Sequence, residues 1–482
     1  MNYRLITNII GRILCVEALF MLPALFISLR HGERASAVSF MLAIVLTALV
    51  GAVLAFVIKP KRRGYFARDG FVTVGLAWIL VSAFGALPMC ISGAIPSYID
   101  SLFETISGFT TTGSTILTDI ESLPRGILYW RSFTHWLGGM GVLVFMLAIG
   151  PRRGDGESIY VLRAESPGPS VGKLVPRMQQ TASILYRIYI GMTVLQVVLL
   201  LLGGVPMFDA VTITFGTAGT GGFTITNNSL AAYSLYAQTV TTIFMIAFGV
   251  NFSLYYLLLV RDFKSVYKNE ELRVYLGIIL AAAVAIAIDI YPIYGNLYEA
   301  WHNSAFQVAS IISTTGFATA NFDTWPELSR VILFLLMFVG AMAGSTGGGL
   351  KIVRVSLIIK AARRAIVTML HPNSVKLVHM DGELVDEEVV NGVKEYLLIY
   401  MLIIAGSVLL ISADPFVDFE TNITAVITCL NNVGPGLGLI GPVCNFSQFS
   451  IFSKIVLSVN MLLGRLELFP ILILTVPSAW KK

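Results

Sequence analysis

Charged side chains are scarce in this sequence of 482 residues. Asp, Glu, Lys and Arg make up 13% of it, whereas an average soluble domain has roughly 25%. With 56% hydrophobic residues, the chain does not have the composition of a water-soluble protein. Apolar stretches of about 20 residues recur from end to end, which is the length that a helix needs to cross a bilayer. The sequence therefore predicts an all-α polytopic membrane protein.

Side chains suited to metal binding or catalysis are also few. No pair among the four cysteines has metal-ligand spacing, and we expect them to be small buried hydrophobes. His135 is interpreted as structural. Residues 344–351 superficially resemble a phosphate-binding loop but lack its Gly-Lys-Ser/Thr order. The sequence predicts no enzyme and no organic cofactor. The small net charge of +5, with basic residues beside apolar stretches, does not indicate nucleic-acid binding.

Four short glycine-bearing segments interrupt this apolar chain. They read TTTGS, TGGF, STTGF and NVGP, at 110–114, 220–223, 313–317 and 432–435. Each follows a stretch too short to cross a bilayer, as re-entrant helices are. These short helices are expected at 101–110, 208–218, 298–312 and 418–430. An apolar span flanks each unit on both sides, so we predict four unequal copies of one helix–loop–helix element.

The predicted organisation is four pore repeats around one pore, preceded by two extra N-terminal transmembrane helices. Residues 1–64 hold the extra helices, and the repeats are 65–181, 182–271, 272–392 with a gating loop, and 393–482. The ten predicted spans are 8–28, 36–58, 70–92, 126–149, 182–204, 232–260, 272–291, 327–345, 393–412 and 447–476.

The beginnings of the short helices carry a repeat of their own. Each has an aromatic, an acidic and a small residue in succession, and an acid in a first helical turn complements the helix dipole. The triplets are Phe103-Glu104-Thr105, Phe208-Asp209-Ala210, Tyr298-Glu299-Ala300 and Phe419-Glu420-Thr421. One triplet would fit any amphipathic helix, but four at matching places indicate internal duplication.

The distribution of charge predicts the orientation. Basic clusters at 59–63, 152–153, 261–264, 351–364 and 481–482 would be cytoplasmic, with both termini inside. The outer connections are rich in acids: Asp100, Glu104, Asp119, Glu121, Asp209, Glu299, Asp323, Glu327, Asp414, Asp418 and Glu420. Such acids would concentrate cations at an outer mouth. Alternatively, acids simply populate the translocated side. The polar cytoplasmic stretches 151–180 and 371–392 are interpreted as solvated loops, although either could bind a partner.

A ring of glycine-bearing loops has the chemistry of an ion filter. Backbone carbonyls replace the water shell of a potassium ion, glycine permits the required backbone angles, and threonine adds hydroxyl oxygens. The candidate ion-binding residues are Thr111, Thr112, Gly113, Thr220, Gly221, Gly222, Thr314, Thr315, Gly316, Asn432, Val433 and Gly434. Packing of small residues between helices is the alternative. It explains one glycine, but not four loops that each follow a short helix.

Two further features could control ion flow. The candidate gating residues are Gly344, Ser345, Thr346, Gly347, Gly348, Gly349, Lys351 and Arg465. The glycine-rich stretch would be a flexible constriction below the filter, or else a simple helix break at the cytoplasmic surface. Arg465, expected inside a span, would be a positive barrier in the pore, or else pair structurally with a carbonyl or acid. Glu467 is two residues away and points elsewhere on a helix, so it is a poor local partner.

These motifs resemble the Trk, Ktr and HKT superfamily of potassium transporters over about residues 65–476. The two extra N-terminal spans are most similar to its bacterial TrkH membrane subunits. The resemblance implies that Gly113, Gly222, Gly316 and Gly434 are filter glycines. It also implies that residues 344–349 form the gating loop and that Arg465 is the pore arginine. Glycine rather than serine at Gly113 implies potassium selectivity. The form Asn432-Val433-Gly434-Pro435-Gly436 is the usual variant of the fourth filter.

The resemblance also implies a channel-like pseudo-fourfold fold and a homodimer in the bacterial inner (plasma) membrane. A cytosolic TrkA-type nucleotide-binding ring would regulate it, and K⁺ would be the transported ion. The expected function is potassium uptake through the pore. Symport of potassium with sodium or protons is the alternative, and a receptor or scaffold that does not conduct is a third hypothesis of a different class.

Overall fold

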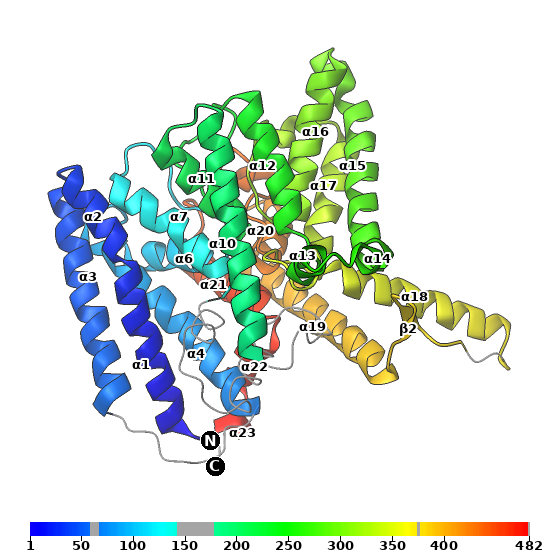
Figure 1. Ribbon diagram of the computed structural model, residues 1–482, viewed down its shortest axis with the longest axis horizontal. Helices are drawn as coiled ribbons and strands as arrows, with labels where there is room; N and C mark the ends of the chain where they lie inside the picture. The colour runs from blue at the N-terminus through cyan, green and yellow to red at the C-terminus, as the bar shows by residue number, and fades with distance from the viewer. Residues whose placement is uncertain (58–66, 142–177, 374–375, 481–482) are drawn as a thin grey trace.

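The computed structural model describes residues 1–57, 67–141, 178–373 and 376–480 (Figure 1). The described part is helical apart from one antiparallel hairpin of β1 (His379–Met380) and β2 (Glu383–Leu384). Two predicted basic clusters, 59–63 and 152–153, lie outside the described residues. Residues 151–177 of the first polar stretch and the last two lysines also lie outside the described residues.

The two predicted N-terminal spans form a helical hairpin beside the rest of the bundle (Figure 1). They consist of α1 (Tyr3–Phe20), α2 (Leu22–Arg30), α3 (Arg34–Ala52) and the π-helical turn η1 (Val53–Val57). Gly11 of α1 and Gly51 of α3 face each other, and a Cβ built on either would lie 2.7–2.9 Å from the other's carbonyl oxygen. Small residues at this crossing therefore allow the two backbones to touch.

The remaining helices repeat one order four times: a long helix, a short helix, a glycine-bearing loop and a second, shorter or broken helix. The first series is α4 (Ala67–Gly85), α5 (Leu87–Ile91), α6 (Tyr98–Phe109) and α7 (Arg125–Gly139). The second is α10 (Met178–Leu202), α11 (Met207–Gly219), α12 (Leu235–Phe248), α13 (Phe252–Leu259) and α14 (Phe263–Lys268). The third is α15 (Glu270–Tyr294), α16 (Leu297–Ile312), η2 (Phe322–Thr324), α17 (Glu327–Val339) and α18 (Ile352–Leu370). The fourth is α19 (Glu387–Ile411), α20 (Phe419–Asn431), η3 (Gly438–Ile440), α21 (Ile451–Arg465), α22 (Phe469–Thr475) and α23 (Pro477–Trp480).

Six helices in the described ranges are long and apolar enough to cross a membrane, or seven if one bent pair counts as a span. The chain is thus a multi-pass membrane protein. The bent pair corrects the prediction of one span at 232–260, because α12 and α13 meet at 94°. Gly249 ends α12, and the Asn251 side chain accepts the Ser253 N–H at 2.8 Å to start α13 in a new direction.

Two other predicted spans are also interrupted. The span expected at 327–345 ends at Val339, and α18 starts only after an irregular segment, 340–351. The span expected at 447–476 breaks after Arg465, where Glu467 and Leu468 both have positive φ. Both interruptions lie at predicted gating features. The glycine-rich stretch predicted the first break, whereas Arg465 was expected inside a continuous apolar span.

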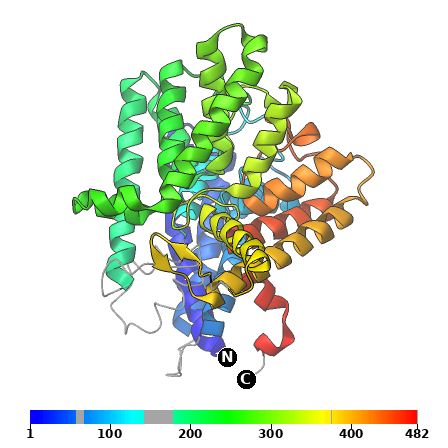
Figure 2. The ribbon, with the colours of Figure 1, turned by 90° about the vertical axis from the view of Figure 1, so that its right-hand side faces the viewer.

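The C-terminal turns of the four short helices, α6, α11, α16 and α20, are buried in the bundle. Their length is 12 to 16 residues. In contrast, α18 projects away from the body and is seen almost end-on in Figure 2. The polar stretch 371–392, predicted as a loop, contains the β1–β2 hairpin beside α18 and the first turns of α19. Of the cysteines, all free, Cys429 is buried as expected but Cys444 is exposed.

A buried carboxyl group in α1 gives a stability prediction. Glu17 is 2% exposed, and neither of its side-chain oxygens has a hydrogen-bond partner among the described residues. An unsatisfied buried polar group costs roughly 1–3 kcal/mol. Glu17→Leu should therefore raise the Tm of the detergent-solubilised protein, measured by intrinsic fluorescence, whereas Glu17→Gln should not. A lower Tm for the leucine variant would mean that the carboxyl group has a stabilising ligand.

Candidate functional site

The four short helices end in one shared backbone motif. Each is followed by a non-glycine residue in the left-handed region, with φ between 54° and 59°. These residues are Thr111, Thr220, Thr314 and Asn432. In every case the N–H of that residue bonds to the carbonyl three residues back, and the next N–H bonds to the carbonyl five back. This is the Schellman motif, which turns the chain sharply out of a helix.

The conformation is costly for residues with a Cβ, by roughly 1–2 kcal/mol each. Four occurrences at matching places therefore mean that the surrounding structure holds the loops in it. Neither threonine nor asparagine by itself requires a left-handed φ. In the sequence, the only sign of this conformation is therefore that threonine or asparagine recurs two residues before the glycine of each loop.

Two residues after each left-handed position comes a glycine, and the four glycines form a closed cycle. Gly113, Gly222, Gly316 and Gly434 all have positive φ, from 78° to 102°. A Cβ added to any of them would come within 3.0 Å of a carbonyl oxygen in another loop. The contacts run Gly113 to Gly221, Gly222 to Thr315, Gly316 to Val433 and Gly434 to Thr112.

In each of these contacts, the carbonyl oxygen belongs to the residue that directly precedes the glycine of its own loop. The chain therefore brings four loops, far apart in sequence, into one ring in which loop one meets both loop two and loop four. The same four glycines line a single cavity of about 120 Å³. All twelve predicted ion-binding residues lie in these loops. Nine of them are buried, and the three half-buried ones are Gly113, Gly222 and Gly316.

Side chains reinforce the closure between the first and fourth loops. The Asn432 amide donates to the Thr112 hydroxyl at 2.9 Å, and the Ser114 hydroxyl donates to the Gly434 carbonyl at 3.2 Å. Asparagine in the fourth loop therefore forms a bridge that a threonine hydroxyl is too short to make.

The threonine hydroxyls proposed as ion ligands have protein partners. The Thr220 hydroxyl donates to the Gly219 carbonyl at 2.6 Å. The Thr314 hydroxyl accepts the Gly348 N–H at 2.6 Å, and the Thr111 hydroxyl accepts from Arg465 at 3.2 Å. The last two therefore contact the predicted gating residues.

An ion-pair network behind the first two loops was not anticipated. Glu104 was assigned to the outer acids and to a first helical turn. However, α6 already starts at Tyr98, so Glu104 lies further inside the helix and is fully buried. Its carboxylate accepts from Arg131 Nε at 2.6 Å, from the Thr115 hydroxyl at 2.9 Å and from the Ile116 N–H at 3.0 Å. It therefore holds the segment that leaves the first loop.

Arg131 and His135, both on α7, connect this network to the second loop. The Arg131 guanidinium donates to the Thr224 carbonyl at 2.8 Å and lies 3.5 Å from the Phe223 ring centre. His135 Nδ1 bonds to the Gly108 carbonyl at 2.8 Å, and its Nε2 accepts the Phe223 N–H at 3.2 Å. The imidazole is therefore a structural bridge between α6 and the second loop.

Removing one partner of the Glu104–Arg131 ion pair should destabilise the protein more than removing both. Arg131→Met leaves a buried carboxylate without its cation, which costs about 3–5 kcal/mol. We expect a large loss of Tm and of monodisperse protein in size-exclusion chromatography. The double variant Glu104→Gln with Arg131→Met should recover much of the loss. If it is as unstable as Arg131→Met alone, the ion pair is not the cause.

Other acids of the predicted outer side are paired as well. Asp100 accepts from Lys454 at 2.7 Å, and Arg330 contacts Asp323 at 3.5 Å and also Glu420. The Asp209 carboxylate accepts from the Tyr233 hydroxyl at 3.1 Å. Much of the predicted acidic mouth is therefore used in structural contacts, which a count of acids cannot distinguish from a free surface charge.

The segment 340–351 packs against the ends of the short helices. Besides the bond from Gly348 to Thr314, a Cβ on Gly348 would overlap the Asn431 carbonyl. The Thr346 hydroxyl donates to the Phe248 carbonyl at 3.2 Å. Thr346 is fully buried. The segment therefore touches the third and fourth glycine-bearing units.

Arg465 joins this segment to the first unit. It is the last residue of α21, not the middle of a continuous span. Its guanidinium donates to the Thr111 hydroxyl and to three carbonyls, those of Thr346 at 2.8 Å, of Gly139 at 2.7 Å and of Gly138. Glu467 forms an ion pair with Arg354 of α18. The Lys351 ammonium donates to the Gly347 carbonyl within the segment itself.

Glu271 connects the segment to the first turn of α18 and was not singled out in the sequence. One of its oxygens accepts the Ala343 N–H at 2.8 Å and the Val353 N–H at 3.2 Å. An acid at the start of a span looks like ordinary helix capping, so its longer-range role had no sequence signal.

Comparison with known proteins agrees with this geometry. Residues 36–286 and 295–482 match the family described as TrkH, cation transport protein. The chain is 34% identical to the Trk system potassium uptake protein TrkH of Escherichia coli K12 and 31% identical to TrkG of the same organism. Both alignments cover all of this chain, together with 100% of TrkH and 99% of TrkG.

A solved structure is also similar over its whole length. The crystal structure of the potassium transporter TrkH from Vibrio parahaemolyticus is 31% identical, with a TM-score of 0.89 and full coverage of both chains. These matches confirm the predicted resemblance and a transport protein rather than an enzyme. The chain belongs to the TrkH family of cation transport proteins.

Proposed function

We propose that this protein takes up potassium through a single pore whose selective part is the ring of Gly113, Gly222, Gly316 and Gly434. The closed cycle of glycine–carbonyl contacts is the observation that carries the proposal. The similar Trk system proteins are named for potassium uptake, which supports potassium as the ion.

The ring has the electrostatics that a cation filter needs. Carbonyl oxygens replace a hydration shell without a fixed charge that would trap the ion. The C-termini of α6, α11, α16 and α20 all end at the ring, and each contributes a partial negative charge of about half an electron. The twelve loop residues from Thr111 to Gly434 identified in the sequence are the proposed ion-binding set.

We propose the predicted repeats, 65–181, 182–271, 272–392 and 393–482, as the four quarters of the pore. The recurring Schellman motifs support this division. Both termini would be cytoplasmic, in the inner membrane of a bacterium, with the 120 Å³ cavity on the outer side. An inside-negative potential then favours uptake by about 2.3 kcal/mol per charge per 100 mV.

The proposed gate consists of residues 344–349 together with Lys351 and Arg465. The bonds from Arg465 to Thr111 and from Gly348 to Thr314 support a position next to the ring, where the segment would obstruct ions that leave the filter. The gate would open when Arg465 releases the Thr346 carbonyl. A homodimer and a cytosolic TrkA-type nucleotide-binding ring are the proposed assembly and regulator.

Radioactive rubidium uptake into proteoliposomes tests the proposal. Uptake should follow the membrane potential alone. A requirement for a sodium or proton gradient would favour symport, and no flux with or without the regulator would favour a receptor or scaffold.

A further inference from the structure

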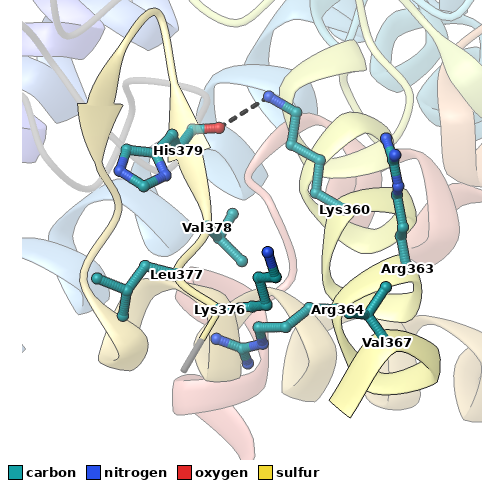
Figure 3. A pocket seen from close by; sticks show the side chains of 8 residues that line it. All are labelled: Lys360, Arg363, Arg364, Val367, Lys376, Leu377, Val378 and His379. Carbon is teal, nitrogen blue, oxygen red and sulfur yellow. Dashed lines mark hydrogen bonds between the residues drawn. The ribbon is translucent and has the colours of Figure 1, made fainter. Parts of the chain in front are cut away.

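A basic pocket lies between α18 and the β1–β2 hairpin, and it shares no lining residue with the ring (Figure 3). Its volume is about 320 Å³. Four fixed cations and one histidine line it: Lys360, Arg363, Arg364, Lys376 and His379. Val367, Leu377 and Val378 complete its walls.

Two of the cations already have acidic partners. Lys360 pairs with Glu270 at 2.5 Å, and Arg364 forms a two-point contact with Glu387 at 2.6 and 2.7 Å. Arg363 and Lys376 have no ion-pair partner in the part of the chain that the structure describes. The pocket therefore keeps an excess of two positive charges and favours an anion.

The two paired acids also locate the pocket relative to the bilayer. Glu270 is the first residue of α15, and Glu387 is the first residue of α19. Both helices are long and apolar enough to cross a membrane. A pocket tied to the ends of two spans lies at the level where lipid headgroups meet water.

An apolar groove adjoins the pocket along α18. It has a volume of about 640 Å³ and is lined mainly by Ile358, Ala361, Ala365, Met369 and Leu397, and Thr368 and Lys394 also line it. Arg364 lines both the groove and the pocket. Several apolar side chains of α18 are exposed, among them Ile366 and Met369. Basic and apolar side chains on one helix are typical of a helix at a membrane surface.

We propose that this pocket binds the phosphate group of an anionic phospholipid, whose acyl chain lies along the adjoining groove. Arg363 and Lys376 neutralise the phosphate, and Arg364 marks the boundary between headgroup and chain. The two unpaired positive charges account for the binding of an anion. The adjoining apolar groove favours a lipid with an acyl chain over free phosphate. Since α18 begins at the end of segment 340–351, the bound lipid would also fix the helix that follows this segment.

The test is a binding titration of the full-length protein in detergent. The probes are dioctanoyl phosphatidylglycerol, dioctanoyl phosphatidylcholine and inorganic phosphate, measured by native mass spectrometry. The variant Arg363→Gln with Lys376→Gln removes both unpaired charges. The matched control, Lys264→Gln with Lys268→Gln, removes two exposed lysines of α14, the short helix that directly precedes α15.

We expect phosphatidylglycerol to bind more tightly than phosphatidylcholine. The pocket variant should weaken it roughly 30-fold, because each cation near a membrane surface contributes about fivefold. The control should bind as the wild type does. Equal binding by pocket variant and control would overturn the proposal, as would equal binding of the two lipids. Inorganic phosphate that binds as tightly as the lipid would also overturn it. Because no flux is measured, failure here is separate from failure of the proposed transport.

Discussion

Gly113→Ser is expected to reduce the preference for potassium over sodium by on the order of tenfold. The added Cβ would overlap the Gly221 carbonyl, so that carbonyl must move out of the ring. Overpacking of this kind costs about 1–3 kcal/mol, and 1.4 kcal/mol corresponds to a factor of ten in an equilibrium. The measurement is competition of sodium with radioactive rubidium uptake in proteoliposomes.

The matched control is Gly93→Ser. Gly93 has a similar positive φ of 76°, but no atom lies within 4 Å of its added Cβ. It therefore carries the backbone strain of the substitution without the overlap. We expect normal selectivity for the control. If both variants keep the wild-type selectivity, Gly113 is not a filter residue.

Arg465→Ala is expected to raise potassium flux on the order of tenfold in the absence of any regulator. The guanidinium ties the Thr346 carbonyl to the first short-helix unit, and bonds to a charged group contribute roughly 1.5–3 kcal/mol each. In the proposed gating mechanism, loss of that tie lets segment 340–351 open more often. Flux into proteoliposomes at a fixed potential measures the effect.

Arg465→Lys separates the two possible causes. Lysine keeps the positive charge but cannot make the same set of bonds to three backbone carbonyls and a hydroxyl. Flux that rises in both variants identifies the tie as the closing element. Flux that rises only in the alanine variant identifies a charge barrier. An alanine variant that folds normally but conducts no more than wild type would refute both roles.

Much of the fold was accessible from the sequence because it depends on local and repeated patterns. Apolar length predicted the six helices of the described ranges that are long enough to cross a membrane, and the recurrence of Thr-Gly segments predicted which loops belong together. The same reasoning predicted Asn432 as the counterpart of Thr111, and the two residues share the same left-handed backbone.

The parts that were missed depend on partners distant in the chain. Glu104 looks like one more outer acid until Arg131 lies beside it, and Glu271 looks like a helix cap until segment 340–351 folds onto it. The bend between α12 and α13 was hidden because both halves are equally apolar. Composition cannot show such features, since it does not record which side chains face each other.

The most direct measurement of the central claim is anomalous scattering from crystals grown in rubidium. Rubidium substitutes for potassium and can be located by its own signal. We predict peaks enclosed by the carbonyls of Thr112, Gly221, Thr315 and Val433, which should disappear in crystals grown in sodium. Rubidium bound elsewhere, with none at this ring, would contradict the account.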